Sequence, residues 1–414
     1  MSRRSLLRGR AADDVLLALR RISRALLDLP AKARRDPSVA NGVAGFALAH
    51  ATLHPLFPRS GHMDRAHASL DRAIGRLART PMSPYLYAGF TGVAWAEEHL
   101  RGDPSDEDDA NEAIDDALIT YLSETPWRES FDLLRGLAGY GVYALERLPR
   151  PSARRILELV VARLADTARR RKPGIAWWSD PLWVSPRYRQ KPHLAWNLGI
   201  AHGMPGVVGV LAGALRAGIS PRVTRRLFDD AVAWLLAQEL PEPTDAGFAL
   251  ATGRGVPREP ARTAWCYGDP GVAGALLAAA TAVNDRALEA HAIRIALRAA
   301  ERPVAACRVN DAGLCHGAAG LGHTFHRMYL TTGNARLARA ARSWLVRALD
   351  FRREIDAIAG FGAWSPGENG GSPTWSPELG LLEGIAGIAL AFSAALTGED
   401  PTWDRLLLLS LRAA

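Results

Sequence analysis

The stretch HGMPGVVGVLAGAL (residues 202–215) carries the short pattern that decides the fold of this chain. Two glycines three residues apart open a run of small and apolar residues, which is typical of a buried helix. The pattern occurs seven times in 414 residues. The first glycines of the copies are Gly42, Gly89, Gly136, Gly203, Gly268, Gly317 and Gly384. They lie 47, 47, 67, 65, 49 and 67 residues apart, and such repetition indicates an array of helical repeats.

A second kind of segment precedes each copy of the pattern. Its apolar residues recur at intervals of three and four, so we expect an amphipathic helix with one solvated face. These segments are 13–29, 65–79, 109–122, 152–171, 223–240, 284–303 and 335–353. We therefore predict seven pairs of an outer and an inner helix. Because the first and last inner helices lack the polar face that caps an open solenoid, we predict a closed α,α-toroid, an all-α fold.

The stretches between the helices show no linker that would divide the chain, so we expect one domain over residues 1–414. Two Pro/Trp-rich loop insertions are expected at about 173–196 and 361–377, the first with room for a short hairpin. A short final helix is expected at about 402–412, packed across the closure of the ring. Three tryptophans flank the loops and are candidates either for a peptide groove or for core packing: Trp196, Trp364 and Trp375.

The composition excludes several classes of protein. Hydrophobic residues make up 48% and charged residues 23%, which excludes a disordered chain. No run of eighteen apolar residues occurs, so no membrane-spanning helix is expected. Three cysteines and the absence of a signal-peptide pattern predict a reducing compartment, the cytoplasm. The net charge of +8 fits either an ordinary solvated surface or an acidic peptide partner. No basic run with interleaved aromatic residues indicates a nucleic-acid partner.

The copies differ in the residues directly before the first glycine. Two consecutive copies have cysteine two positions before it, Cys266 and Cys315, and His316 follows the second cysteine. In a closed ring these positions point to one end of the central hole, so we expect the three side chains to converge. Cysteine sulfur and histidine nitrogen are common zinc ligands. Three protein ligands with an open fourth position are typical of a catalytic zinc site, which here could hold a thiolate. The alternative is that both cysteines are ordinary buried residues, as we expect for Cys307, which lies outside this register.

Four further residues occupy or neighbour the same register. His202 is a candidate acid or base, with a fourth metal ligand or a core histidine as alternatives. Asp132 either orients His202, accepts a proton or caps a helix. Arg262 either holds a developing enolate by its charge or is structural. Tyr267 either donates a hydrogen bond in the site or packs its wall. Three other histidines are expected to have no role: His193, His323 and His326.

At these residues the sequence resembles the lanthipeptide cyclases of the lanthionine synthetase C-like family, over about residues 35–397. The segments that carry the resemblance are FDLLRGLAG (131–139), NLGIAHGMPG (197–206), RTAWCYGDPG (262–271), GLCHGAAG (313–320) and LLEGIAGIAL (381–390). The resemblance implies a double α-toroid that holds zinc at the top of the ring. By motif match, the zinc ligands are Cys266, Cys315 and His316. The family's active-site residues fall on His202, Asp132, Arg262 and Tyr267.

The implied reaction is a Michael-type addition within a precursor peptide. A cysteine of the peptide binds zinc as thiolate and attacks the β-carbon of dehydroalanine or dehydrobutyrine, and protonation of the enolate gives a lanthionine or methyllanthionine ring. His202 is expected to move the proton. Because the first inner helix begins near residue 38, we expect a free-standing cyclase that depends on a separate dehydratase. A transporter is a second candidate partner.

Three alternatives stay open at this point. The same zinc site would serve the addition of glutathione or another thiol to dehydrated residues. A non-catalytic scaffold in a peptide-modifying complex is a second alternative. A third is another toroid enzyme, such as a zinc prenyltransferase, whose ligand set resembles Asp-Cys-His, or a glycosidase with paired carboxylates. Here the register holds one aspartate and one glutamate, Asp132 and Glu383.

Overall fold

The computed structural model describes residues 5–101, 109–179, 195–241, 244–367 and 371–412. The described chain is mainly helical and divides into two compact units. Unit 1 comprises Met1–Met82 and Arg308–Pro401, and unit 2 comprises Ser83–Cys307 and Thr402–Ala414. The single domain expected over residues 1–414 stays a prediction. None of the described helices is long and apolar enough to cross a membrane.

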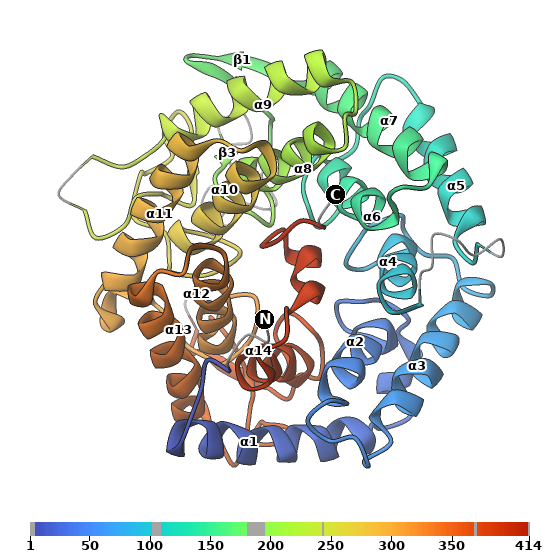
Figure 1. The fold of residues 1–414 in the computed structure, drawn as a ribbon, viewed down its shortest axis with the longest axis vertical. Coiled ribbons are helices and arrows are strands. Elements are labelled where there is room, and N and C mark those ends of the chain that lie inside the picture. The colour runs from blue at the N-terminus through green and yellow to red at the C-terminus, as the bar shows by residue number, and fades with distance from the viewer. Residues whose placement is uncertain (1–4, 102–108, 180–194, 242–243, 368–370, 413–414) are drawn as a thin grey trace. The chain divides into compact units, whose positions relative to one another are not determined.

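The glycine-led segments are helices, as predicted, and their side chains are buried nearly all round. Unit 1 contains α2 (Val43–Leu53), α12 (Ala318–Thr332) and α14 (Ile385–Thr397). Unit 2 contains α4 (Phe90–Arg101), α6 (Leu137–Arg147), α8 (Met204–Arg216) and α10 (Asp269–Val283). Within each unit these inner helices pack side by side: α14 contacts α2 and α12, and α6, α8 and α10 follow α4 in order (Figure 1).

The amphipathic segments are also helices. Unit 1 contains α1 (Arg10–Leu27), α3 (His62–Leu77) and α13 (Ala335–Arg347). Unit 2 contains α5 (Glu112–Ser123), α7 (Pro151–Thr167), α9 (Pro221–Leu236) and α11 (Arg286–Glu301). Their buried residues lie on one face, and within unit 2 α9 and α11 cover α8 and α10 (Figure 1).

The pairing of outer with inner helices differs from the sequence prediction. We expected each outer helix to pair with the inner helix that follows it, but α3 packs on α2, α7 on α6, α9 on α8, α11 on α10 and α13 on α12. The lengths of the connections explain the difference. Only Asn284 and Asp285 separate α10 from α11, so these helices fold back on each other as antiparallel neighbours. The longer connections into the inner helices leave room for functional loops.

The glycine pattern is explained by the loop that leads into each inner helix. In the third copy, the N–H of Leu137 donates to the carbonyl of Ser130, six residues before Gly136 (3.2 Å). We call the residue six positions before the first glycine the anchor residue. Its carbonyl satisfies a backbone donor of the first helical turn, which has no partner within the helix. The same bond joins Val43 to Asp36, Phe90 to Ser83, Ala318 to Asp311 and Ile385 to Glu378.

Both glycines of the pattern are required by this close approach. A Cβ atom on Gly203 would collide with the carbonyl of its anchor residue Asn197, and one on Gly206 would lie 2.7 Å from the carbonyl oxygen of Ile200. The two glycines therefore admit a neighbouring backbone at close range. The neighbour is the preceding loop of the same repeat, so the glycines fix where that loop ends.

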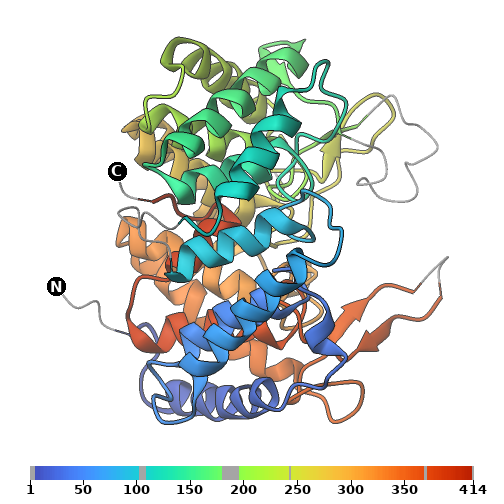
Figure 2. The same ribbon diagram turned by 90° about the vertical axis from the view of Figure 1, so that its right-hand side faces the viewer.

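Short antiparallel strands lie in the connections. Strand β1 (Arg169–Arg171) pairs with β2 (Gly174–Ala176), β3 (Trp196–Asn197) with β4 (Ala251–Thr252), and β5 (Ala363–Ser365) with β6 (Thr374–Ser376). The two predicted loop insertions contain parts of these hairpins, and residues 180–194 and 368–370 within them lie outside the described residues. Hairpin β5–β6 extends away from the helices of unit 1, with Trp364 opposite Trp375 (Figure 2).

Four short 3₁₀ helices complete the described elements: η1 (Ala33–Arg35), η4 (Val304–Cys307), η5 (Ala348–Phe351) and η7 (Thr402–Leu407). The short helix expected at about 402–412 is the 3₁₀ helix η7, which ends at Leu407. The carbonyl of Leu406 accepts from Tyr87 Oη (2.8 Å) and that of Leu407 from Trp265 Nε1 (3.0 Å), so both acceptors are used outside the segment. Leu408, with φ of 54°, then turns the chain out of the helix.

The account of the glycine pattern can be tested within one helix. Gly206→Ala places a methyl group 2.7 Å from the Ile200 carbonyl oxygen, so we expect the free energy of unfolding to fall by about 1–3 kcal/mol. Gly209→Ala is the matched control in α8, because its methyl group meets no atom closer than a Leu408 side-chain carbon at 3.4 Å. There, alanine should gain up to about 1 kcal/mol of helix propensity. Denaturant unfolding measures both variants, and equal stabilities would contradict the account.

Candidate functional site

The predicted site residues lie in the loops that lead into the inner helices. Unit 2 carries Asp132 before α6, His202 before α8, and Arg262, Cys266 and Tyr267 before α10. Unit 1 carries Cys315 and His316 before α12. Each loop therefore presents its side chains beside the N-terminus of a buried helix, where the unpaired N–H groups and the helix dipole favour negative charge.

Asp132 and His202 form a hydrogen-bonded pair in unit 2. Their Oδ2 and Nδ1 atoms are 2.8 Å apart, and the side chains are 2% and 12% exposed. The other carboxylate oxygen of Asp132 accepts the N–H of Arg135 (2.7 Å), while the Asp132 N–H donates to Ser130 Oγ (3.1 Å). Asp132 thus bonds the backbone before α6 and orients His202. Because the carboxylate faces Nδ1, it fixes the orientation of the His202 imidazole ring.

The loops before α8 and α10 bring Tyr267 next to this pair. The ring centroids of His202 and Tyr267 are 6.4 Å apart. Nδ2 of the buried Asn197 donates to Tyr267 Oη (3.0 Å), and Oδ1 of Asn197 accepts the N–H of Gly199 (2.8 Å). Gly199 has no room for a side chain, because a Cβ atom there would collide with the Tyr267 ring and the Cys266 carbonyl. Asn197 was not among the predicted site residues.

The chain around Cys266 is held from both sides. Cys266 is 6% exposed, and its neighbour Trp265 donates to the Leu407 carbonyl. Asp269, the first residue of α10, accepts the N–H groups of Gly247 (2.8 Å) and Phe248 (3.0 Å) and the Nε–H of Arg298 (3.2 Å). Burial raises the pKa of Asp269, although these donors oppose the shift. The position of Cys266 is therefore fixed by buried contacts.

Arg262 lies four residues before Cys266 and is half-buried. Its backbone carbonyl packs against Gly268, whose φ of 93° suits glycine. Among the residues that the structure describes, none accepts a hydrogen bond from the Arg262 guanidinium or forms an ion pair with it. The positive charge of this side chain is thus open to an anion in the described part of unit 2.

Cys315 and His316 lie together in unit 1, where the loops before α12 and α14 meet. The Cys315 N–H donates to the Leu382 carbonyl (2.7 Å). Nε2 of His316, whose side chain is 18% exposed, lies 3.9 Å from Oδ2 of Asp311, whose side chain is 2% exposed. Asp311 also accepts the N–H groups of Gly313 (3.0 Å) and Trp364 (3.0 Å). Asp311 was not predicted either.

Cys307, His323 and His326, which were expected to have no role in the site, lie in the cores of their units. Cys307 is fully buried, and its Sγ donates to the Pro303 carbonyl (3.4 Å). His323 and His326 are buried in α12, and His193 lies outside the described residues. Trp196 is 7% exposed and packs under Arg171, whose guanidinium carbon is 4.5 Å from the ring centroid.

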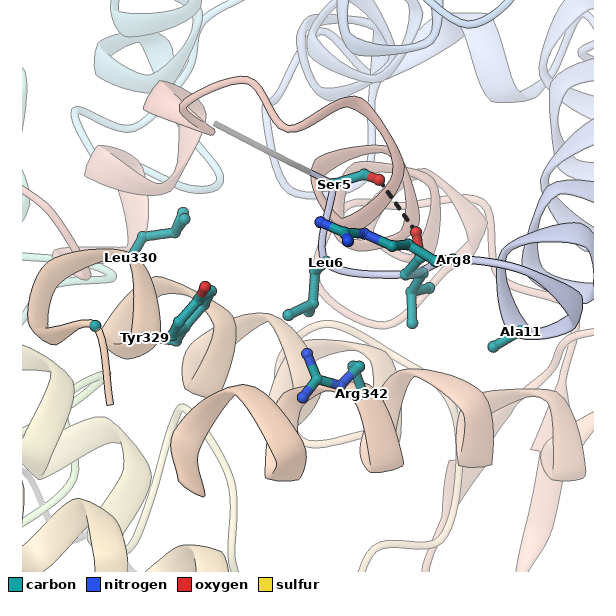
Figure 3. A pocket seen from close by; sticks show the side chains of 9 residues that line it. Ser5, Leu6, Arg8, Ala11, Tyr329, Leu330 and Arg342 are labelled. Carbon is teal, nitrogen blue, oxygen red and sulfur yellow. Dashed lines mark hydrogen bonds between the residues drawn. The ribbon is translucent and has the colours of Figure 1, made fainter. Parts of the chain in front are cut away.

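A pocket of about 770 Å³ in unit 1 lies away from these residues. Arg8, Tyr329 and Arg342 extend into it beside Leu6 and Leu330 (Figure 3). The pocket adjoins the C-terminal end of α12, whereas Cys315 and His316 precede its N-terminal end. The helix between has 15 residues, which at 1.5 Å per residue is about 22 Å. This pocket is therefore distinct from the candidate site residues Cys315 and His316 of unit 1.

Comparisons with known proteins agree with this arrangement. A solved structure titled "Nisin cyclase" matches with a TM-score of 0.75 at 20% sequence identity, over 94% of this chain and 97% of that chain. This likeness shows the fold and confirms the predicted all-α fold of the α,α-toroid class. No curated protein matches the chain. The family profile of the lanthionine synthetase C-like proteins matches residues 34–408, which include every predicted site residue. The chain therefore belongs to the lanthionine synthetase C-like family.

Proposed function

We propose that this protein is a zinc-dependent cyclase that adds cysteine thiols of a dehydrated precursor peptide to dehydroalanine or dehydrobutyrine. The products are the thioether rings of lanthionine and methyllanthionine. The observation that carries the proposal is the set of two cysteines at equivalent positions before α10 and α12 with one histidine directly after the second, in a chain of the lanthionine synthetase C-like family.

We propose that Cys266 of unit 2 and Cys315 and His316 of unit 1 hold one zinc ion. The donor set fits zinc, because two thiol sulfurs and one imidazole nitrogen are its preferred ligands. Three protein ligands leave one coordination position for a substrate sulfur. A bound zinc ion would supply a positive centre that favours the thiolate form of the substrate cysteine at neutral pH.

The other residues handle the proton and the developing charge. In the addition, the substrate S–H bond and the π bond of the dehydroalanine or dehydrobutyrine alkene break, a C–S bond forms at the β-carbon, and the α-carbon gains a proton. We assign the proton transfer to Nε2 of His202, which Asp132 orients through Nδ1 at 2.8 Å. The Tyr267 hydroxyl and the Arg262 guanidinium are assigned to the enolate oxygen, where a hydrogen bond and a positive charge stabilise the transition state.

We also propose partners and a cellular location for the enzyme. The substrate needs its alkenes made beforehand, so a separate dehydratase is a proposed partner, and a transporter is a further candidate. None of the three cysteines, all of which the structure describes, forms a disulfide, which suits the proposed cytoplasmic location. Addition of glutathione to dehydrated residues would use the same groups, so glutathione belongs in every assay as a competing thiol.

The zinc site predicts a specific loss of metal. Cys315→Ala should reduce the zinc content from about one ion per chain to a small fraction, because a ligand is lost. Cys307→Ala is the matched control, since Cys307 is buried in the core and should keep the metal. Elemental analysis after purification without chelators measures both. Zinc retained by Cys315→Ala, or absent from the unsubstituted protein, would refute the site.

The Asp132–His202 pair predicts a loss of turnover without a loss of metal. Asp132→Asn keeps the shape of the side chain but removes the charge that holds Nδ1–H, so we expect kcat to fall by about 10²- to 10⁴-fold. Ser130→Ala, which removes only the bond to the Asp132 backbone, should change kcat little. Ring formation is followed by mass spectrometry after alkylation of the remaining thiols. An Asp132→Asn variant with the turnover of Ser130→Ala would argue against the assignment.

A further inference from the structure

Four of the anchor residues form the same local turn. In four copies the anchor side chain accepts the N–H of the residue two positions further on: Asp36 from Ser38 (2.8 Å), Ser130 from Asp132 (3.1 Å), Asn197 from Gly199 (2.8 Å) and Asp311 from Gly313 (3.0 Å). This turn shapes the loop before the inner helix and occurs whether or not the repeat carries a candidate catalytic group. A structural role therefore accounts for one acceptor of each anchor side chain.

Asp311 has a second carboxylate oxygen that this turn does not use. Oδ2 lies 3.9 Å from Nε2 of His316, within the range of an ion pair, and accepts the N–H of Trp364 at the start of hairpin β5–β6 (3.0 Å). The side chain is 2% exposed. A buried carboxylate facing one nitrogen of a metal-binding histidine fixes the orientation of the ring and makes the other nitrogen a stronger ligand.

In unit 2, the side-chain amide of Asn197 also has a second group, Nδ2, that the turn does not use. Its Nδ2–H donates to Tyr267 Oη (3.0 Å), and Asn197 is 1% exposed. Because the phenol oxygen already accepts this bond, its own hydrogen is directed to another acceptor. An amide at this position therefore prepares Tyr267 to donate a hydrogen bond, whereas a carboxylate would draw the phenol hydrogen to itself.

We propose that Asp311 and Asn197 are positioning residues, one for the metal ligand His316 and the other for the hydrogen-bond donor Tyr267. The inference rests on the proposed function and adds to it a second layer of residues at the anchor position. It assigns Nδ1 of His316 to the metal, because Nε2 faces Asp311. The side chains of Asp36 and Ser130 form the same turn, and within the described part of the chain they bond no proposed catalytic or metal-binding side chain, so they provide matched controls.

Zinc affinity tests the role of Asp311. We expect Asp311→Asn to weaken zinc binding by about 10- to 100-fold in competition with a chromophoric chelator. Asp36→Asn makes the same chemical change in the same kind of turn and should bind zinc as the unsubstituted protein does. Thermal unfolding of the metal-free variants reports any general damage to the fold.

The outcomes separate the two proposals. No zinc binding by the unsubstituted protein would overturn the proposed metal site and the role of Asp311 with it. Equal zinc affinity of Asp311→Asn and the unsubstituted protein would overturn only the role of Asp311, leaving it a turn residue. If Asp311→Asn does not fold, the Asn197 experiment still decides whether anchor residues position the site.

A double-mutant cycle tests the role of Asn197. Asn197→Asp keeps an oxygen for the Gly199 N–H but makes the other atom an acceptor, so we expect kcat to fall by the same factor as in Tyr267→Phe, with KM little changed. The double variant should lose no more than either single variant, because both remove one donated hydrogen bond. Multiplicative losses, or full activity of Asn197→Asp, would overturn the proposal.

Discussion

The close contact between the backbone of the preceding loop and a glycine at the start of each inner helix is the constraint on which the described structure depends. The anchor carbonyl oxygen occupies the space of a Cβ atom at five of the first glycines: Gly42, Gly89, Gly136, Gly203 and Gly268. In the copies anchored by Asp36, Ser83, Ser130, Asp311 and Glu378, the anchor carbonyl accepts an N–H of the first helical turn. A side chain at either glycine would push the loop away from the helix. The inner helices are apolar on almost every side, so a displaced loop would also expose backbone donors that lie at the end of a buried element.

This constraint separates the parts of the repeat that must stay constant from those that can vary. The glycines and the anchor carbonyl act through backbone geometry, which leaves the side chains between them open to change. Those intervening side chains include Asp132, His202, Cys266 and Cys315. A fixed loop end gives each of them a defined position without a dedicated scaffold. In unit 2 this is enough to set Asp132 and His202, which are 70 residues apart in the chain, within hydrogen-bond distance.

Much of the fold and of the candidate site follows from the sequence because both are repeated. Periodicity located all the inner and outer helices, and alignment on the first glycine located the cysteines and histidines. That alignment compared the one or two residues before the first glycine, together with Asp132 and Arg262. Asn197 and Asp311 lie six residues before the glycine and were therefore not predicted. Their signal was present, because the anchor position is polar in every copy: Asp36, Ser83, Ser130, Asn197, Arg262, Asp311 and Glu378. The 3₁₀ form of η7 was not predictable, since it depends on donors from Tyr87 and Trp265 far away in the sequence.

The charge balance of the proposed site favours an arginine side chain that has no acidic partner. Two thiolates and a neutral imidazole would balance the charge of a zinc ion, so a substrate thiolate adds one negative charge that passes to the substrate carbonyl during the addition. A cation reserved for that charge must not be neutralised beforehand. Both oxygens of Asp132 are bonded, one to His202 and the other to the backbone of Arg135. The Arg262 guanidinium has no acidic partner in the described part of the chain, so in the proposed reaction its charge would be available to the enolate.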